Sequence, residues 1–124
     1  MTDALHIVLD GSALVAAGKG NALASRLIDR AHSTAGFHLY APVCALIEAD
    51  RARRGTAEHI AALPGITLLE LDLSTALAMI QDDTWAWSHC RHAVQPTPDR
   101  PDGAFVATVE PDRWKGYRMI DLTP

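Results

Sequence analysis

The chain has 124 residues, 48% of them hydrophobic and 21% charged, and a formal net charge of −4. This length indicates one domain over residues 1–124, and the charge excludes a general basic field for nucleic acid. No apolar stretch reaches the roughly 20 residues of a membrane span. Cys44 and Cys90 lack a metal-site spacing and are expected to be reduced thiols, and the amino terminus lacks the positive charge of a signal peptide. We therefore expect a cytoplasmic protein that makes no membrane contact.

Apolar runs alternate with helical patterns along the chain. Strands are expected at residues 5–9, 37–40, 66–71, 104–108 and 118–121. Between them we expect a helix over 13–17 capped by Ser12, a second helix capped by Asn21, a third from Pro42 to about Arg54, and a fourth capped by Thr56. A longer helical stretch is expected to begin at Asp72 or Ser74, to break near Asp82–Asp83 and to end near Gln95. Strands that alternate with helices predict an α/β fold with a parallel central sheet and helices on both faces.

Three acids occupy positions that matter in such a fold. Asp10 ends the first apolar strand, Glu110 follows the fourth, and Glu48 lies in a helix between them. Because the carboxyl ends of parallel strands face the ligand crevice, these acids could converge on a divalent cation. Each also has a simpler explanation: Asp10 as a cap or turn residue, Glu48 as a solvent-facing residue, and Glu110 as an exposed loop acid.

The joint pattern resembles the PIN-domain family of small metal-dependent ribonucleases, which includes toxins of bacterial toxin–antitoxin pairs. The segment 7–14 is similar to the family's strand-Asp-x-Ser-helix start, and 42–51 to its helix with the second acid, here Glu48. The segment 106–114 looks like its closing strand, which usually ends Thr-x-Asp and here ends Thr108-Val109-Glu110. The resemblance covers essentially the whole chain.

This resemblance implies a three-layer α/β/α sandwich and an acidic cluster that binds Mg²⁺ or Mn²⁺. Asp10, Glu48 and Glu110 would be the catalytic, metal-binding carboxylates, with Ser12 and Thr108 as hydrogen-bonding support. The expected reaction is metal-assisted phosphodiester hydrolysis, in which the cation activates a water and offsets charge on the leaving oxygen. The substrate would be RNA.

Two departures from the family pattern predict a weakened site. His92 stands where the family usually carries its third acid, and Glu110 replaces an aspartate. Because Mg²⁺ accepts nitrogen ligands poorly, His92 as a fourth ligand would shift the site towards Mn²⁺ or Zn²⁺, or leave it empty. From the sequence we expect slow cleavage that an acid at position 92 would increase. Prolines 96, 98 and 101 also interrupt the helix that normally follows.

Further residues suggest partners. Arg51, Arg53 and Arg54 could hold RNA phosphates or could simply complement a helix carboxyl end. Trp85 and Trp87 could stack on bases, but buried core or dimer contacts are the commoner role of such residues. The resemblance also implies an antitoxin protein and a homodimer.

A second function remains open from the sequence. The chain could be a catalytically inactive PIN-fold protein that acts as an RNA- or protein-binding regulatory module, since a fold does not fix a function.

Overall fold

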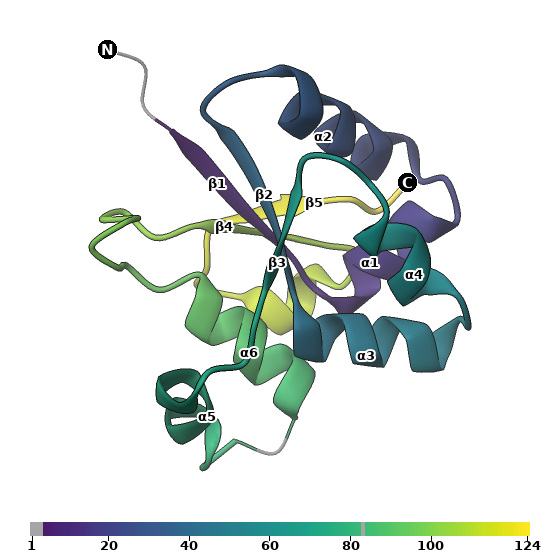
Figure 1. The fold of residues 1–124 in the computed structure, drawn as a ribbon. Helices are drawn as coiled ribbons and strands as arrows, with labels where there is room; N and C mark the ends of the chain where they lie inside the picture. The colour runs from purple at the N-terminus through teal and green to yellow at the C-terminus, as the bar shows by residue number, and fades with distance from the viewer. Residues whose placement is uncertain (1–3, 83) are drawn as a thin grey trace.

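The computed structural model describes residues 4–82 and 84–124 and has one five-stranded sheet flanked by helices (Figure 1). The strands are β1 (Leu5–Leu9), β2 (Phe37–Pro42), β3 (Ile66–Leu69), β4 (Phe105–Thr108) and β5 (Met119–Asp121), in the order β3-β2-β1-β4-β5. The helices are α1 (Gly11–Gly18), α2 (Ala22–Ser33), α3 (Val43–Ala52), α4 (Thr56–Ala61), α5 (Leu73–Met79), α6 (Trp85–Ala93) and the 3-10 helix η1 (Pro111–Trp114).

Every pair of neighbouring strands is parallel, which confirms the predicted fold class. The chain order reverses direction at β1, whose neighbours are β2 and β4. Leu9 is in register with Ala107, and the Asp10 amide donates to the Ala107 carbonyl at 3.2 Å. The tips of β1 and β4 therefore lie side by side, as the strand-then-acid pattern predicts. This reversal is where open parallel sheets form their ligand crevice.

The helices cover both faces of the sheet. Phe37 and Tyr40, three residues apart on β2, point to opposite faces because side chains alternate along a strand. The Arg30 guanidinium of α2 lies over the Phe37 ring at 5.1 Å, whereas Arg100, which follows α6, lies over the Tyr40 ring at 4.9 Å. Figure 1 shows α2 and α6 on opposite sides of the strands. The molecule is the expected three-layer α/β/α sandwich.

Several element boundaries differ from the expected ones. Asp10, rather than Ser12, caps α1, because its Oδ1 accepts from Ala13 N at 2.8 Å. Gly55 precedes α4 with a left-handed φ of 95°, so Thr56 is the first helical residue rather than the cap. β2 continues through Pro42, which pairs with Leu69. Elsewhere α3 ends at Ala52, β3 ends at Leu69, and the shorter β4 and β5 start at Phe105 and Met119.

The expected long helical stretch is two helices. Asp72 caps the first, α5, by accepting from Thr75 N at 2.8 Å, and α5 ends at Met79. The second, α6, begins at Trp85 and ends at Ala93. The predicted break near residues 82 and 83 lies between them, although residue 83 is outside the described part of the chain.

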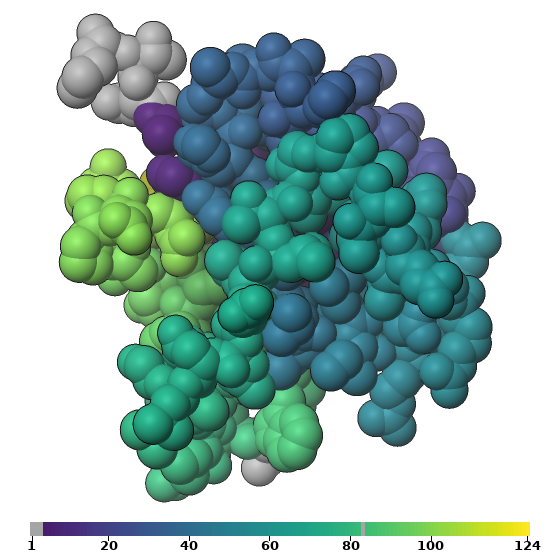
Figure 2. All heavy atoms as spheres, in the orientation of Figure 1, coloured from purple at the N-terminus to yellow at the C-terminus, as the bar shows by residue number. Residues whose placement is uncertain are grey.

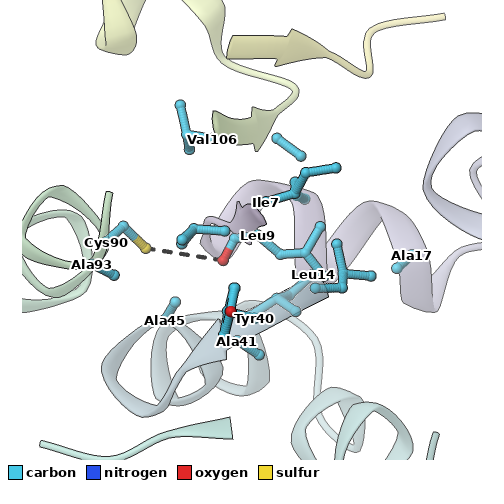
Figure 3. Packing of buried hydrophobic residues seen from close by; sticks show 14 of the residues in the cluster. Ile7, Leu9, Leu14, Ala17, Tyr40, Ala41, Ala45, Cys90, Ala93 and Val106 are labelled. Carbon is cyan, nitrogen blue, oxygen red and sulfur yellow. Dashed lines mark hydrogen bonds between the residues drawn. The ribbon is translucent and has the colours of Figure 1, made fainter. Parts of the chain in front are cut away.

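The core is made by small and branched side chains from both layers and the sheet. Figure 3 shows Ile7 and Leu9 of β1 between Leu14 of α1 and Cys90 of α6. The Cys90 thiol is fully buried and donates weakly to the Leu9 carbonyl, with Sγ 3.9 Å from the oxygen. Both cysteines are free thiols, as expected. No helix within residues 4–82 and 84–124 is long and apolar enough to cross a membrane.

Gly65, just before β3, provides a test of the packing between α2 and β3. Its φ is 85°, and a β-carbon there would lie 2.8 Å from the His32 backbone nitrogen. Gly20 has a similar φ of 84° but open space around it. We expect Gly20→Ala to cost about 1–2 kcal/mol of unfolding free energy from backbone strain alone. Gly65→Ala should cost a further 1–3 kcal/mol, roughly, from overpacking.

Urea unfolding of both variants and the parent measures this difference. Equal losses for Gly65→Ala and Gly20→Ala would contradict the close approach of α2 to the residue before β3.

Candidate functional site

Asp10 lies at the carboxyl end of β1 and is 6% exposed, so its carboxylate requires hydrogen-bond partners. Its Oδ1 accepts from the Ser12 hydroxyl at 2.6 Å and from Ala13 N at 2.8 Å. Its Oδ2 accepts from the indole Nε1 of Trp114 at 2.9 Å. A carboxylate offers about four lone-pair directions, so Oδ2 retains one for a further ligand.

Ser12 and Thr108 support Asp10, at the positions where the sequence predicts hydrogen-bonding support. The Ser12 hydroxyl lies 3.2 Å from the Thr108 hydroxyl and accepts from Val109 N at 3.1 Å. The Thr108 Oγ1 also accepts from Glu110 N at 2.9 Å. These bonds join the start of α1 to the end of β4 and fix the orientation of the Asp10 carboxylate.

Trp114, which the sequence analysis does not identify as a site residue, is the third support. Its side chain is fully buried and stacks on Trp87 with a ring-centroid distance of 5.4 Å. The Arg91 guanidinium lies over the Trp87 ring, 5.5 Å from its centroid, and forms an ion pair with Asp82 at 2.7 Å. The sequence offered one signal for this contact, because a tryptophan that is buried needs an acceptor for its indole N–H. Trp87 therefore belongs to the packing behind Asp10, which is the core role that the sequence analysis gave as one of two common roles.

Glu48 lies on α3 against the first turn of α1. Its Oε1 is so close to Gly11 that a β-carbon at residue 11 would collide with it. Gly11 has no positive φ, so its role here is space and not backbone freedom. Glu48 is half-buried and shares the site with Asp10, next to the Cys90 thiol. Glu48 therefore lies against the residue that follows Asp10, the other carboxylate of the predicted pair.

The Cys90 thiol is close enough to these two carboxylates to feel their charges. Burial raises its pKa well above the ordinary value, and the negative charges of Asp10 and Glu48 raise it further. The thiol therefore stays protonated at neutral pH, buried against the Leu9 carbonyl.

Glu110 lies at the edge of this arrangement. Its backbone precedes η1, its side chain is 49% exposed, and its Oε1 is 3.6 Å from Arg113 Nη1. It follows β4 as predicted, but it faces a surface arginine.

His92 does not reach the site, and the prediction that it completes an acidic cluster is wrong. It is two residues from Cys90 on α6, so the two side chains diverge by about 200° around the helix axis. His92 instead lies near Asp72 and His89. The pKa of the Asp72 carboxyl is lowered mainly by hydrogen bonds from Thr75, and the two imidazoles lower it further. His89 is buried, accepts from Cys44 N at 3.4 Å, and has a lowered pKa through burial and the neighbouring His92.

Across residues 4–82 and 84–124, no three His, Cys, Asp or Glu side chains lie close enough together to hold a metal ion. The predicted four-residue ligand set is therefore not assembled; the pair of Asp10 and Glu48 is what the fold brings together. Their oxygens are the ligands that Mg²⁺ prefers, and Mg²⁺ is often held by one or two carboxylates with waters and substrate phosphates. The two carboxylates therefore fit a cation that keeps several water ligands. They do not fit a site in which protein side chains supply every ligand.

A groove of about 440 Å³ adjoins Glu48. Arg51, Ile47 and Cys44 line it from α3, and Thr84, Trp85 and Ala86 line it from the start of α6. Of the three predicted RNA-binding arginines, only Arg51 lines this groove. Arg53 and Arg54 line a separate pocket with Gly18 and His59, and Arg54 pairs with Asp50 at 3.6 Å.

The chain matches no protein-family model and no curated protein.

Gly11→Ala tests the contact between α1 and Glu48. Alanine is the better helix former, so α1 itself is expected to gain slightly in stability. The new methyl group must displace the Glu48 carboxylate, and Mn²⁺ affinity should fall by about ten- to a hundredfold, as for a lost metal ligand. Gly18→Ala is the control, because its β-carbon would meet only ordinary contacts at 3.7 Å.

Calorimetric titration with Mn²⁺ measures the affinity of both variants and of the parent protein. An unchanged isotherm for Gly11→Ala would show that Glu48 takes no part in cation binding.

Proposed function

We propose that this chain is a PIN-like, metal-dependent endoribonuclease of weakened activity, with Asp10 and Glu48 as its catalytic carboxylates. The observation that carries this proposal is the close approach of Glu48 to Gly11, which sets a second carboxylate beside Asp10. Asp10 follows β1, where the strand order reverses, and this is the usual ligand crevice of an open parallel sheet.

The residues of the site have separable tasks in this proposal. Asp10 and Glu48 would hold Mg²⁺ or Mn²⁺, which would acidify a bound water and offset charge on the scissile phosphate. Ser12, Ala13 N and Trp114 hold the Asp10 carboxylate in one orientation, so little reorganisation is needed when substrate binds.

Arg51 is the residue best placed to hold substrate. It lines the same groove as Glu48, and its guanidinium can bind a phosphate in two-pronged fashion. A weak nuclease of this type fits the role of toxin in a toxin–antitoxin pair, so we include an antitoxin protein among the proposed partners.

A binding or regulatory protein without catalytic activity is the second candidate. It is favoured by the absence, in the described residues, of a third metal-binding side chain beside Asp10 and Glu48. The two functions differ in one respect: the binding module would retain RNA or its protein partner when both carboxylates are neutralised, and would never cleave.

Cleavage of a generic single-stranded RNA with Mn²⁺ tests the nuclease directly. Asp10→Asn and Glu48→Gln should each lower the rate by about ten- to a hundredfold or more, because each removes a metal ligand. Asp72→Asn is the matched control, since Asp72 caps α5 as Asp10 caps α1 but lies away from the site.

His92→Asp should leave the rate unchanged, because the new acid would lie near Asp72 and not near Asp10. Cleavage that persists in Asp10→Asn would refute the mechanism, and no cleavage by the parent protein would favour the binding function.

A homodimer is also part of the proposal. Leu73 and Leu77 of α5, with Ile80 at its end, form an apolar stripe and are 75%, 58% and 66% exposed. Trp85 at the start of α6 is 72% exposed. Figure 2 shows α5 projecting at the lower edge of the molecule. Two-fold pairing would bury this stripe, since closed pairs are the commonest oligomers.

Sedimentation equilibrium should therefore give twice the 13.4 kDa chain mass at micromolar concentration. Leu77→Glu should shift the protein to monomer, and Leu23→Glu, on α2, should not. A monomer mass for the parent protein across a wide concentration range would contradict the dimer.

A further inference from the structure

Two histidines lie directly opposite each other on the central strands, at the end of the sheet away from Asp10. His6 of β1 is in register with His38 of β2. Their rings are stacked, with centroids 4.9 Å apart and planes 13° from parallel. Like charges directly opposite on neighbouring strands are destabilising, so this arrangement favours neutral imidazoles.

Tyr40 and Arg100 extend this stack. The Tyr40 hydroxyl lies 2.7 Å from His6 Nδ1, and the Arg100 guanidinium lies over the Tyr40 ring at 4.9 Å. Tyr40 is buried, so the cation–π contact is partly shielded from water and stronger than an exposed one. We call His6, His38, Tyr40 and Arg100 the histidine–arginine stack.

Arg100 also organises the loop 96–103, which connects α6 to β4. Its backbone exchanges hydrogen bonds with Thr97 at 3.0 and 3.1 Å, and its carbonyl accepts from Gly103 N at 2.8 Å. Its Nη2 donates to the Ala93 carbonyl at the end of α6, at 3.3 Å. The loop is therefore closed on itself. Arg100 attaches it to β2 through the Tyr40 ring, and the Arg118 side chain, next to β5, donates to the Asp102 carbonyl on the other side of the loop.

The charges around His6 are balanced when the imidazole is neutral. A pocket of about 420 Å³ between residues 4–6 and the loop is lined by Arg100, Arg118, Asp99 and Asp102. The two arginines offset the two aspartates, so an added imidazolium makes the pocket net positive. Burial lowers the pKa of His6, and the proximity of His38 and Arg100 lowers it further.

We propose that the histidine–arginine stack is a pH-sensitive attachment for the loop 96–103. With neutral imidazoles, Arg100 rests on Tyr40 and the loop is docked on the sheet. When His6 takes up a proton, its imidazolium is a second cation in the stack beside Arg100, and Arg100 leaves Tyr40. The loop then opens at its contact with β1 and β2. This device is independent of the proposed nuclease activity, because none of its members belongs to the Asp10 site.

The direction of the pH dependence follows from His6. Its folded pKa is below the ordinary 6.5, so the unfolded or undocked chain binds the proton first as pH falls. The docked state is fully stable above that value and loses stability as pH falls through the lower folded value.

Amide hydrogen exchange of the whole protein at about pH 7.5 and about pH 5.5 tests the proposal, with rates corrected to protection factors. The protection factors of the Arg100, Gly103 and Ala104 amides should fall by about three- to tenfold at the lower pH. The uptake of one proton sets the limit, at about tenfold per pH unit. Amides of β4 beyond Ala104 should keep their protection. In His6→Gln/His38→Gln the loop should stay protected at both pH values, whereas His32→Gln, on exposed α2 surface, should behave like the parent.

A second measurement holds even if the double variant does not fold. Arg100→Gln removes one cation from the stack, so the NMR titration midpoint of the His6 ring should rise towards the ordinary histidine value. The midpoint of His32 should not move in the same spectra. Constant loop protection in the parent protein, or an unchanged His6 midpoint in Arg100→Gln, would overturn the proposal.

Discussion

The hydrogen bonding of the Asp10 carboxylate is the constraint on which the rest of this structure depends. A charge that is 6% exposed is stable only when its oxygens accept hydrogen bonds, and here the donors are a hydroxyl, a backbone amide and an indole. These donors come from α1 and η1, while Asp10 itself ends β1. The carboxylate thereby ties three elements together at one edge of the sheet, and the Trp114–Trp87 stack extends that connection to α6.

The same bonds bear on the proposed chemistry. They orient Asp10, which favours catalysis, but they also occupy most of its lone pairs. A second carboxylate is available because Gly11 leaves room for Glu48, whereas Glu110 is turned towards Arg113 at the surface. This balance between structural and ligand roles gives a physical reason for a site of reduced strength, and it is the same reason that makes the binding function a serious second candidate.

The two ends of β1 differ in their chemistry. Asp10, at the carboxyl end, is an anion held by neutral and polar donors. His6, four residues earlier, is an imidazole stacked on His38 and hydrogen-bonded to Tyr40, whose ring carries the Arg100 guanidinium. The loop 96–103 extends from the carboxyl end of α6 to the start of β4, which is the end of that strand away from Asp10.

The sequence by itself determined the α/β class, the parallel centre of the sheet and the adjacency of Asp10 and Glu110 at neighbouring strand tips. Apolar runs, caps and turn residues are local signals, and parallel topology follows from their alternation. The sequence also singled out Glu48, Ser12 and Thr108. It could not show that His92 turns away from Asp10, because a count along the chain does not fix the rotation of a helix about its axis. Nor could it show that Trp114 binds Asp10 or that His6 meets His38 and Arg100, since these contacts join residues far apart in the chain. Only tertiary packing decides which distant side chains share one space.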